Sequence, residues 1–167
     1  MEQITTPPPV KDRWPEIHGA IHRAKFSHDI SELSDLLTSG ANIAELADTH
    51  TASGMTVLHS AAFSTVDVID VLIAHGATDL LEVKCGPGEE GRYAGCTALQ
   101  SASKSGYGAV ARRLIHHGAN FDAFSAVALG DESQLRSLYA ADKSVLRATD
   151  DYQASLCLLY TSDAADE

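Results

Sequence analysis

Apolar residues recur along this chain at helical spacing, and three of the runs end in the same phrase. Each run closes with Gly-Ala, and its first paired apolar residue lies four positions before the glycine. The three copies are Leu36–Ala41, Leu72–Ala77 and Leu114–Ala119. Such spacing predicts a helix with one buried face, and a glycine just beyond it can adopt positive φ and end the helix. Recurrence with fixed internal spacing predicts stacked copies of one small unit.

A second pattern precedes each Gly-Ala and predicts a first helix in every unit. Its copies are Ala20–Ala24, Val57–Ala61 and Ala98–Ala102. The second unit is one residue shorter between its alanine and its glycine than the other two, and we place this deletion in the turn after Ala62. The expected helix pairs are 15–26 with 29–38, 57–63 with 66–74, and 98–104 with 108–117.

A fourth unit is visible without a Gly-Ala ending. Residues 124–131 match a first helix and its turn, and Leu135 and Leu138 fall at second-helix positions. We expect helices at 123–129 and 132–141. The unit follows Gly118 too closely for the hairpin that joins the earlier copies. Acidic residues at or near the second-helix starts (Asp29, Asp67 and Asp131) are expected to cap exposed N–H groups there.

Together the two patterns resemble the ankyrin repeat, whose signature is T-P-L-H-x-A in a unit of about 33 residues. The signature proline is replaced here, and its histidine is kept as His22 and His59 but is Gln100 in the third copy. The resemblance implies an all-α solenoid of about four helix-turn-helix units joined by short hairpin or finger loops. It also implies a structural role for the histidine, so we assign His22 and His59 to the scaffold.

The spacing of the repeats divides the chain into an N-terminal lead, a repeat array and a C-terminal tail. The expected segments are a flexible lead at 1–13, an array at 14–153 with units at about 14–47, 48–80, 93–121 and 122–150, an insertion at 80–93, and an incomplete repeat start with a tail at 154–167. Insertions in repeat proteins lie in loops, often on the binding face. Residues 157–167 resemble a translated sequencing adapter, with a natural disordered tail as the alternative, and they are excluded from fold reasoning.

The core is expected to consist of apolar residues on the facing sides of the helices. These residues are Ile21, Leu33, Leu36, Leu58, Ala61, Ile69, Leu72, Leu99, Ala102, Val110, Leu114, Ala126, Leu135 and Leu138. Each unit buries its face only against its neighbours. An array that stops after the fourth unit would leave Leu135, Leu138 and Tyr139 uncovered, and we expect marginal stability or self-association through that layer.

The charge of the chain excludes some partners. The formal net charge of −11 argues against nucleic acid and anionic membranes, which require clustered Lys and Arg, and favours a basic partner. No run approaches the roughly 18 apolar residues of a membrane span. The first 13 residues lack a secretion signal, and three cysteines suit a reducing compartment, so we expect a cytoplasmic protein. The sequence leaves open whether Cys85 and Cys96 pair.

Two segments match a cofactor-binding or catalytic motif by letter, but their residues do not suit that chemistry. Residues 86–91 satisfy G-x-G-x-x-G, but Pro87 removes a backbone donor, and Glu89 and Glu90 would repel a phosphate. Residues 101–104 satisfy S-x-x-K, yet its partner motifs are missing and the four residues fill ordinary helix positions. The eight histidines show no metal-ligand spacing. We therefore expect no catalytic, cofactor or metal site, and no enzyme.

The family resemblance implies that the array binds another protein through its finger loops and the concave face of its first helices. The candidate partner-binding residues are His50, Thr51, Ser60, Phe63, Glu89, Glu90, Arg92, Tyr93, Ser103 and Lys104. For each of them the alternative is an ordinary solvated surface. The rival function is a targeting or regulatory arm of a larger enzyme or effector whose catalytic domain would lie downstream.

Overall fold

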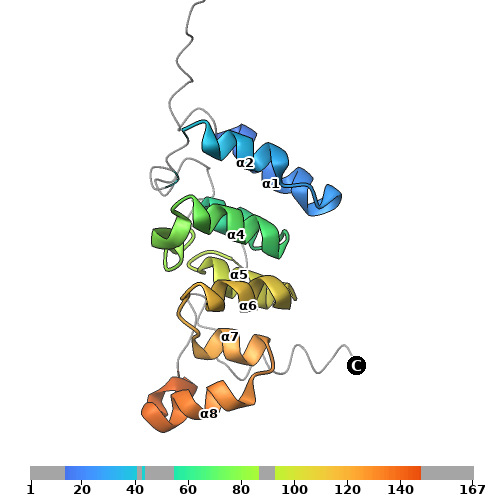
Figure 1. The fold of residues 1–167 in the computed structure, drawn as a ribbon. Helices are drawn as coiled ribbons and strands as arrows, with labels where there is room; N and C mark the ends of the chain where they lie inside the picture. The colour runs from blue at the N-terminus through green and yellow to red at the C-terminus, as the bar shows by residue number, and fades with distance from the viewer. Residues whose placement is uncertain (1–13, 41–42, 44–54, 87–92, 148–167) are drawn as a thin grey trace, which may run out of the picture.

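The described residues fold into four antiparallel helix pairs stacked in chain order (Figure 1). The computed structural model describes residues 14–40, 43, 55–86 and 93–147. The helices are α1 Trp14–Ser27, α2 Ser31–Thr38, α3 Val57–Ala61, α4 Val66–Ala74, α5 Ala98–Lys104, α6 Gly108–His116, α7 Ala123–Ala128 and α8 Glu132–Ala141, with 3-10 turns η3 Ala77–Leu80 and η4 Lys143–Arg147. No strand occurs in these ranges. The expected all-α solenoid is confirmed.

First helices stack on first helices through the array: α1 on α3, α3 on α5, and α5 on α7. Among the second helices, α4 packs on α6. The predicted glycine endings are present, because Gly40, Gly76 and Gly118 have φ of 105°, 99° and 99°. Asp131 also caps as expected, since its Oδ1 accepts the Gln134 N–H at 3.0 Å.

The turn inside each pair shows how the second unit lost its residue. Three of the four turns contain one left-handed residue: His28 (φ 56°), Gly106 (φ 77°) and Gly130 (φ 65°). The second turn has none, and Thr65, the residue before α4, is extended with φ −117°. Helix α3 accordingly ends at Ala61 instead of the expected 63. The deletion therefore shortened α3 and removed the left-handed position.

His28 is the one non-glycine residue with positive φ in the described chain. We expect His28→Gly to raise the free energy of unfolding by about 0.5 kcal/mol, because relief of left-handed strain exceeds the added freedom of the unfolded chain. Urea unfolding measures this change. Gly106 provides the reverse test: no atom lies within 4 Å of an added Cβ there, so Gly106→His should destabilise through backbone strain alone. Equal stability of both variants and the parent would contradict this account.

The core contains most of the predicted residues, with three corrections. Leu37, 3% exposed, is buried in α2 where Leu36 was expected, and Leu36 is only half-buried. Within the described residues the first unit has a layer on one side only, and α2 buries Leu33 and Leu37. Leu135 and Leu138 are also half-exposed, and α8 buries no residue. In the part of the chain that the structure describes, no further layer covers α8.

His59 connects the second unit to the third. Its side chain is fully buried, with Nδ1 accepting from the Thr56 N–H at 3.2 Å and Nε2 donating to the Cys96 carbonyl at 2.9 Å. Burial lowers the pKa of His59, against an opposing effect of the Cys96 bond. Gln100 reproduces the first contact one unit later, since its Oε1 accepts from the Thr97 N–H at 3.0 Å; its Nε2 donates at 2.5 Å to the side chain of Asp122 instead of to a backbone carbonyl.

The scaffold role predicted for His59 is therefore confirmed, but the same prediction for His22 is wrong. His22 is exposed, and its ring lies 5.2 Å from the ring of Phe26 on the next turn of α1. The shared sequence pattern does not separate the two residues. What separates them is the surroundings, since His59 is enclosed against the backbone at Cys96 whereas His22 faces solvent.

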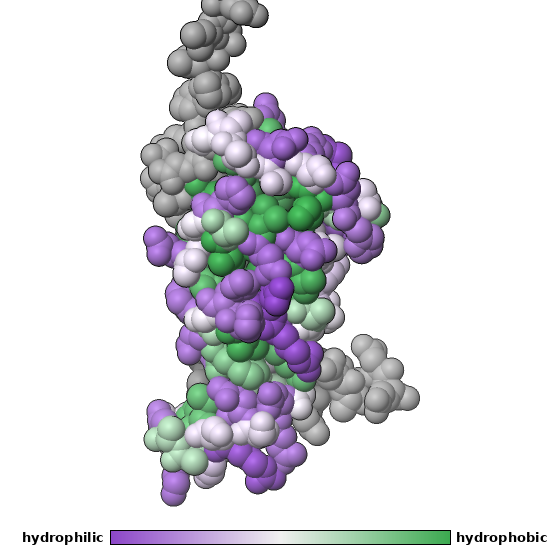
Figure 2. Space-filling model, viewed as in Figure 1, coloured by the Kyte–Doolittle hydropathy of each residue, from purple (hydrophilic) through white to green (hydrophobic). Residues whose placement is uncertain are grey.

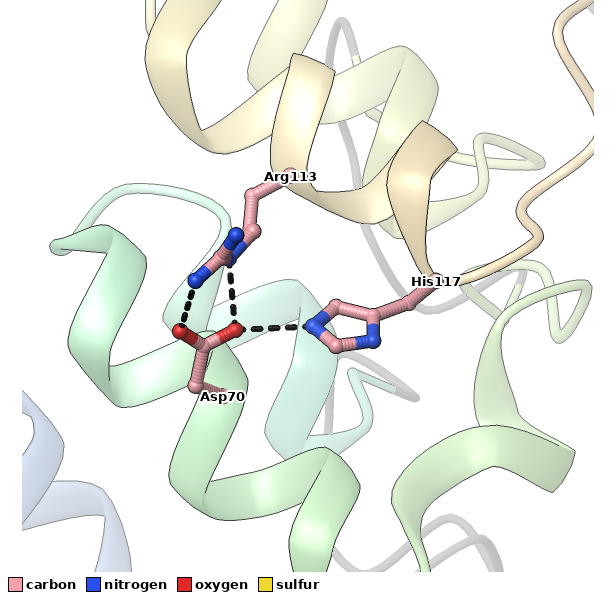
Figure 3. A network of polar contacts seen from close by, with 3 residues as sticks. All are labelled: Asp70, Arg113 and His117. Carbon is pink, nitrogen blue, oxygen red and sulfur yellow. Dashed lines mark hydrogen bonds and ion pairs between the residues drawn. The ribbon is translucent and has the colours of Figure 1, made fainter.

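A carboxylate on α4 joins the second helices of the second and third units (Figure 3). Asp70 accepts two hydrogen bonds from Arg113, at 2.7 and 2.5 Å, and pairs with Nε2 of His117 at 2.7 Å. The Arg113 bond chiefly holds the pKa of Asp70 below its ordinary 3.8. Nothing in the repeat pattern predicts this connection, because the three side chains come from variable positions of two units.

We expect Asp70→Asn to lower the free energy of unfolding by up to about 1 kcal/mol at neutral pH, since partly exposed ion pairs contribute little more. Because the pKa is depressed in the folded state, the contribution is present above the unfolded pKa and disappears as pH falls through the folded value. Thermal melts at pH 7 and pH 3 measure it. The stability difference between the variant and the parent should shrink from pH 7 to pH 3 and in 1 M salt; a gap that does not narrow would contradict the ion-pair interpretation.

The face with α4 and α6 toward the viewer is mostly hydrophilic (Figure 2). Hydrophobic residues concentrate on it at about the level of the second helix pair. This face carries the Asp70 network. The candidate binding residues described next belong to the first helices and their turns.

Candidate functional site

A shallow pocket opens between α1 and α3, and we call it the α1–α3 pocket. It has a volume of about 190 Å³. Its base includes apolar side chains, and its rim carries basic and hydroxyl groups. The lining residues are His18, Ile21, His22, Lys25, Met55, Ser60, Phe63 and Ser64. No acidic residue is among them.

The rim of the pocket is held by contacts between the first two units. Nδ1 of His18 lies 3.0 Å from the Ser60 hydroxyl, and the Ser64 hydroxyl donates to the Ile21 carbonyl at 3.3 Å. Burial, and secondarily the nearby His22, lowers the pKa of His18. The neutral imidazole is therefore favoured at this edge, and the α1–α3 junction is positioned before any partner arrives.

Three aromatic rings adjoin the pocket, and we call them the aromatic cluster: Phe63, Tyr93 and Tyr107. The Phe63 ring meets both tyrosines edge-on, with centroids 5.2 Å from Tyr93 and 5.9 Å from Tyr107. The Tyr93 hydroxyl lies 2.8 Å from the Ser105 hydroxyl. Edge-to-face packing of this kind fixes ring orientation, and each such pair adds about 0.5–1.5 kcal/mol beyond area burial. All three rings are partly exposed, so the cluster presents a preformed apolar surface.

Lys25 extends this surface onto α1. Its Nζ donates to the Tyr107 hydroxyl at 2.8 Å and lies 5.2 Å from the centre of the Tyr107 ring. The next residue, Phe26, is 70% exposed and carries the most exposed large apolar side chain described in the protein. A lysine and a solvated phenylalanine thus border the aromatic cluster.

The structure brings only some of the predicted binding residues to this surface. Phe63 and Ser60 line the pocket, and Tyr93 belongs to the aromatic cluster. Lys104 is half-buried with Nζ 3.4 Å from Sγ of Cys96. Ser103 was expected on the same face, but it is 4% exposed and donates to the Leu99 carbonyl inside its own helix. The remaining candidates lie outside the described residues: His50, Thr51, Glu89, Glu90 and Arg92.

Sequence reasoning missed most of this surface: His18, Ile21, His22, Lys25, Met55 and Ser64 of the pocket lining, with Phe26 and Tyr107 beside it. A signal for one of them existed in the repeat register. Phe26 and Phe63 both stand two residues after the alanine that ends the first-helix pattern, and Lys104 stands there in the third unit. Because Phe63 was chosen as an anchor, the same position in the first unit was a candidate as well.

The described ranges give little support for catalysis, a disulfide, a metal site or a membrane span. Ser101 is 1% exposed inside α5, as expected for a packing position. Cys85 and Cys96 are buried, are joined by a backbone hydrogen bond of 2.8 Å, and form no disulfide. No group of three His, Cys, Asp or Glu residues in these ranges could hold a metal ion. None of the described helices has the length and apolar character needed to cross a membrane.

Comparison with known families decides the identity of the array. A family model for ankyrin repeats, in three copies, matches residues 20–125, which is more than half of the chain. The chain belongs to the ankyrin-repeat family. A search of curated proteins found no match. The match covers the first three helix pairs of this ankyrin-repeat protein almost completely. It includes only the start of the fourth pair. Ankyrin repeats generally mediate protein–protein interactions and are typically not catalytic.

Proposed function

We propose that this ankyrin-repeat protein is a scaffold or adaptor that binds a protein partner through its finger loops and the face of its first helices. The observation that carries the proposal is the preformed surface made by the α1–α3 pocket, the aromatic cluster and Phe26. Aromatic side chains dominate binding energy at protein interfaces. Phe26 contributes almost nothing to the core, being 70% exposed, so a binding role accounts for it better than a structural one.

The size of the pocket favours a side chain of a protein over a free small molecule. Its volume of about 190 Å³ is below the roughly 300–1,000 Å³ of typical ligand pockets. A shallow depression beside a flat aromatic surface is better suited to one anchoring side chain within a larger interface. This supports an interaction protein without a cofactor or reaction of its own.

The whole-chain charge of −11 would attract a basic partner over distances of about 10 Å or less at physiological salt, and this remains a prediction about long-range attraction. A cytoplasmic location likewise remains a proposal. Neither the net charge nor the location bears on which residues contact the partner. The placement of the binding surface is the part that mutation tests directly.

The test is capture of partners from a lysate by the tagged protein and by its Phe26→Ala variant, followed by affinity measurement with the partner identified. We expect Phe26→Ala to weaken binding about tenfold or more, as removal of an interface aromatic does. Tyr139→Ala is the matched control, because Tyr139 is 41% exposed on α8 and far along the array. Phe63→Ala should also weaken binding.

Unfolding curves of all three variants separate lost contact from lost fold. Phe26→Ala should leave the urea midpoint unchanged, since its side chain packs on little. Equal affinity of the parent and the Phe26→Ala and Phe63→Ala variants would show that partners bind elsewhere.

A further inference from the structure

The α1–α3 pocket has a local charge opposite to that of the whole chain. Three of its eight lining residues are His18, His22 and Lys25, and none is acidic. On the neighbouring helix α2, Glu32 is already engaged, since it accepts hydrogen bonds of 2.8 and 2.6 Å from Arg23. The pocket therefore combines the apolar side chains of Ile21, Met55 and Phe63 with the Lys25 ammonium group and two imidazole rings, of which His18 favours the neutral form.

Lys25 is held in a position to receive an anion. One N–H of its ammonium group is donated to the Tyr107 hydroxyl, and the Tyr107 ring lies 5.2 Å from Nζ. An ammonium group has three donors, so two remain for a ligand. Because the hydrogen bond and the cation–π contact already restrict the long side chain, binding an anion costs less conformational entropy than it would at a mobile lysine. Lys25 is thus preorganised.

We infer that the α1–α3 pocket receives an apolar side chain from a partner segment in which an adjacent Asp or Glu pairs with Lys25 and His22. This inference rests on the proposed function and specifies the chemistry of the segment. An apolar group alone would leave Lys25 without a counter-charge, and a free carboxylate alone would not fill the space beside Ile21, Met55 and Phe63. A nucleic acid carries a phosphate at every nucleotide, so the net charge of −11 opposes it far more strongly than it opposes a segment with a single carboxylate.

The experiment selects binders from a phage-displayed library of random heptapeptides against the full chain. Synthetic copies of the enriched peptides are then measured by fluorescence anisotropy. We expect enrichment of Asp or Glu next to Leu, Phe, Tyr or Trp. Lys25→Gln and His22→Gln should each weaken these peptides about fivefold, with a larger loss in the double variant, as for other close charge pairs at interfaces. Binding should weaken as salt increases.

Matched controls carry the same substitutions at exposed positions elsewhere: Lys143→Gln on η4 and His116→Gln on α6. They should bind like the parent. Urea unfolding verifies that Lys25→Gln is folded despite losing its bond to Tyr107. A labelled single-stranded oligonucleotide tests the phosphate alternative. The inference would be overturned if the oligonucleotide binds the parent and this binding is lost in the Lys25→Gln variant.

The outcomes also separate this inference from the proposed function. Enrichment of basic or uncharged peptides that are lost in Phe63→Ala or Phe26→Ala but not in Lys25→Gln would overturn the acidic segment and leave the binding surface standing. Enriched peptides that bind all of these variants as tightly as the parent, or no enrichment at all, would count against both the inference and the proposed function.

Discussion

Replacing His59 with leucine should lower the free energy of unfolding by about 2 kcal/mol, because the buried Thr56 N–H would lose its partner at about 1–3 kcal/mol, whereas the Cys96 carbonyl would keep the Cys85 N–H. Leucine fills similar space, so the loss reports the hydrogen bonds more than a cavity. Urea unfolding followed by circular dichroism measures it.

His59→Gln is the matched control, since Gln100 in the third unit accepts from the equivalent backbone N–H and also donates to the next unit. It should recover more than half of the loss. If glutamine and leucine destabilise equally, the two hydrogen bonds are not the reason that His59 matters.

The same residue predicts a pH dependence. Burial lowers the folded pKa of His59 beneath its ordinary 6.5. The contribution of the neutral ring is therefore present above the unfolded pKa and disappears as pH falls through the folded value. The parent should lose more stability than His59→Gln between pH 7.5 and pH 5.

Replacing Leu114 with alanine should cost about 3 kcal/mol, within the 2–5 typical of buried leucine truncations. Leu114 is fully buried in α6. Leu138 occupies the same repeat position in α8, yet it is half-exposed. Leu138→Ala should therefore cost less than about 1 kcal/mol, since surface substitutions seldom exceed 0.5.

The comparison of these two leucines holds residue type and register constant and changes only the surroundings. Guanidinium unfolding of both variants measures the difference. Similar costs at the two positions would mean that α8 is covered in solution, either by the chain itself or by a second copy, as the predicted self-association would require.

The repeat pattern predicted the helix pairs well because each unit repeats the same constraints: an apolar face, a turn and a closing glycine. It misplaced Leu36 and Leu138 because burial depends on having a layer on both sides, and among the described residues the first and last units have one. It could not distinguish His22 from His59, since both occupy the signature position. The difference lies in which backbone each ring meets.

The candidate surface was less predictable than the fold. Phe63 and Tyr93 could be chosen as exposed aromatics on the expected face, and the structure places their rings in contact. Lys25 and Tyr107 are 82 residues apart and meet only because the units stack. No spacing rule brings such a pair together. The pocket depends on the same stacking, because its walls come from different units.

The hydrogen bond from Lys25 to Tyr107 links the first unit to the third and passes over the second. A linear array in which each unit senses only its immediate neighbours can lose its end unit first. Here, opening the amino-terminal pair also removes a contact of the third pair. Amide protons of α1 and of the α5–α6 turn should therefore exchange in one cooperative step, so that the array frays less readily from its amino-terminal end than from α8.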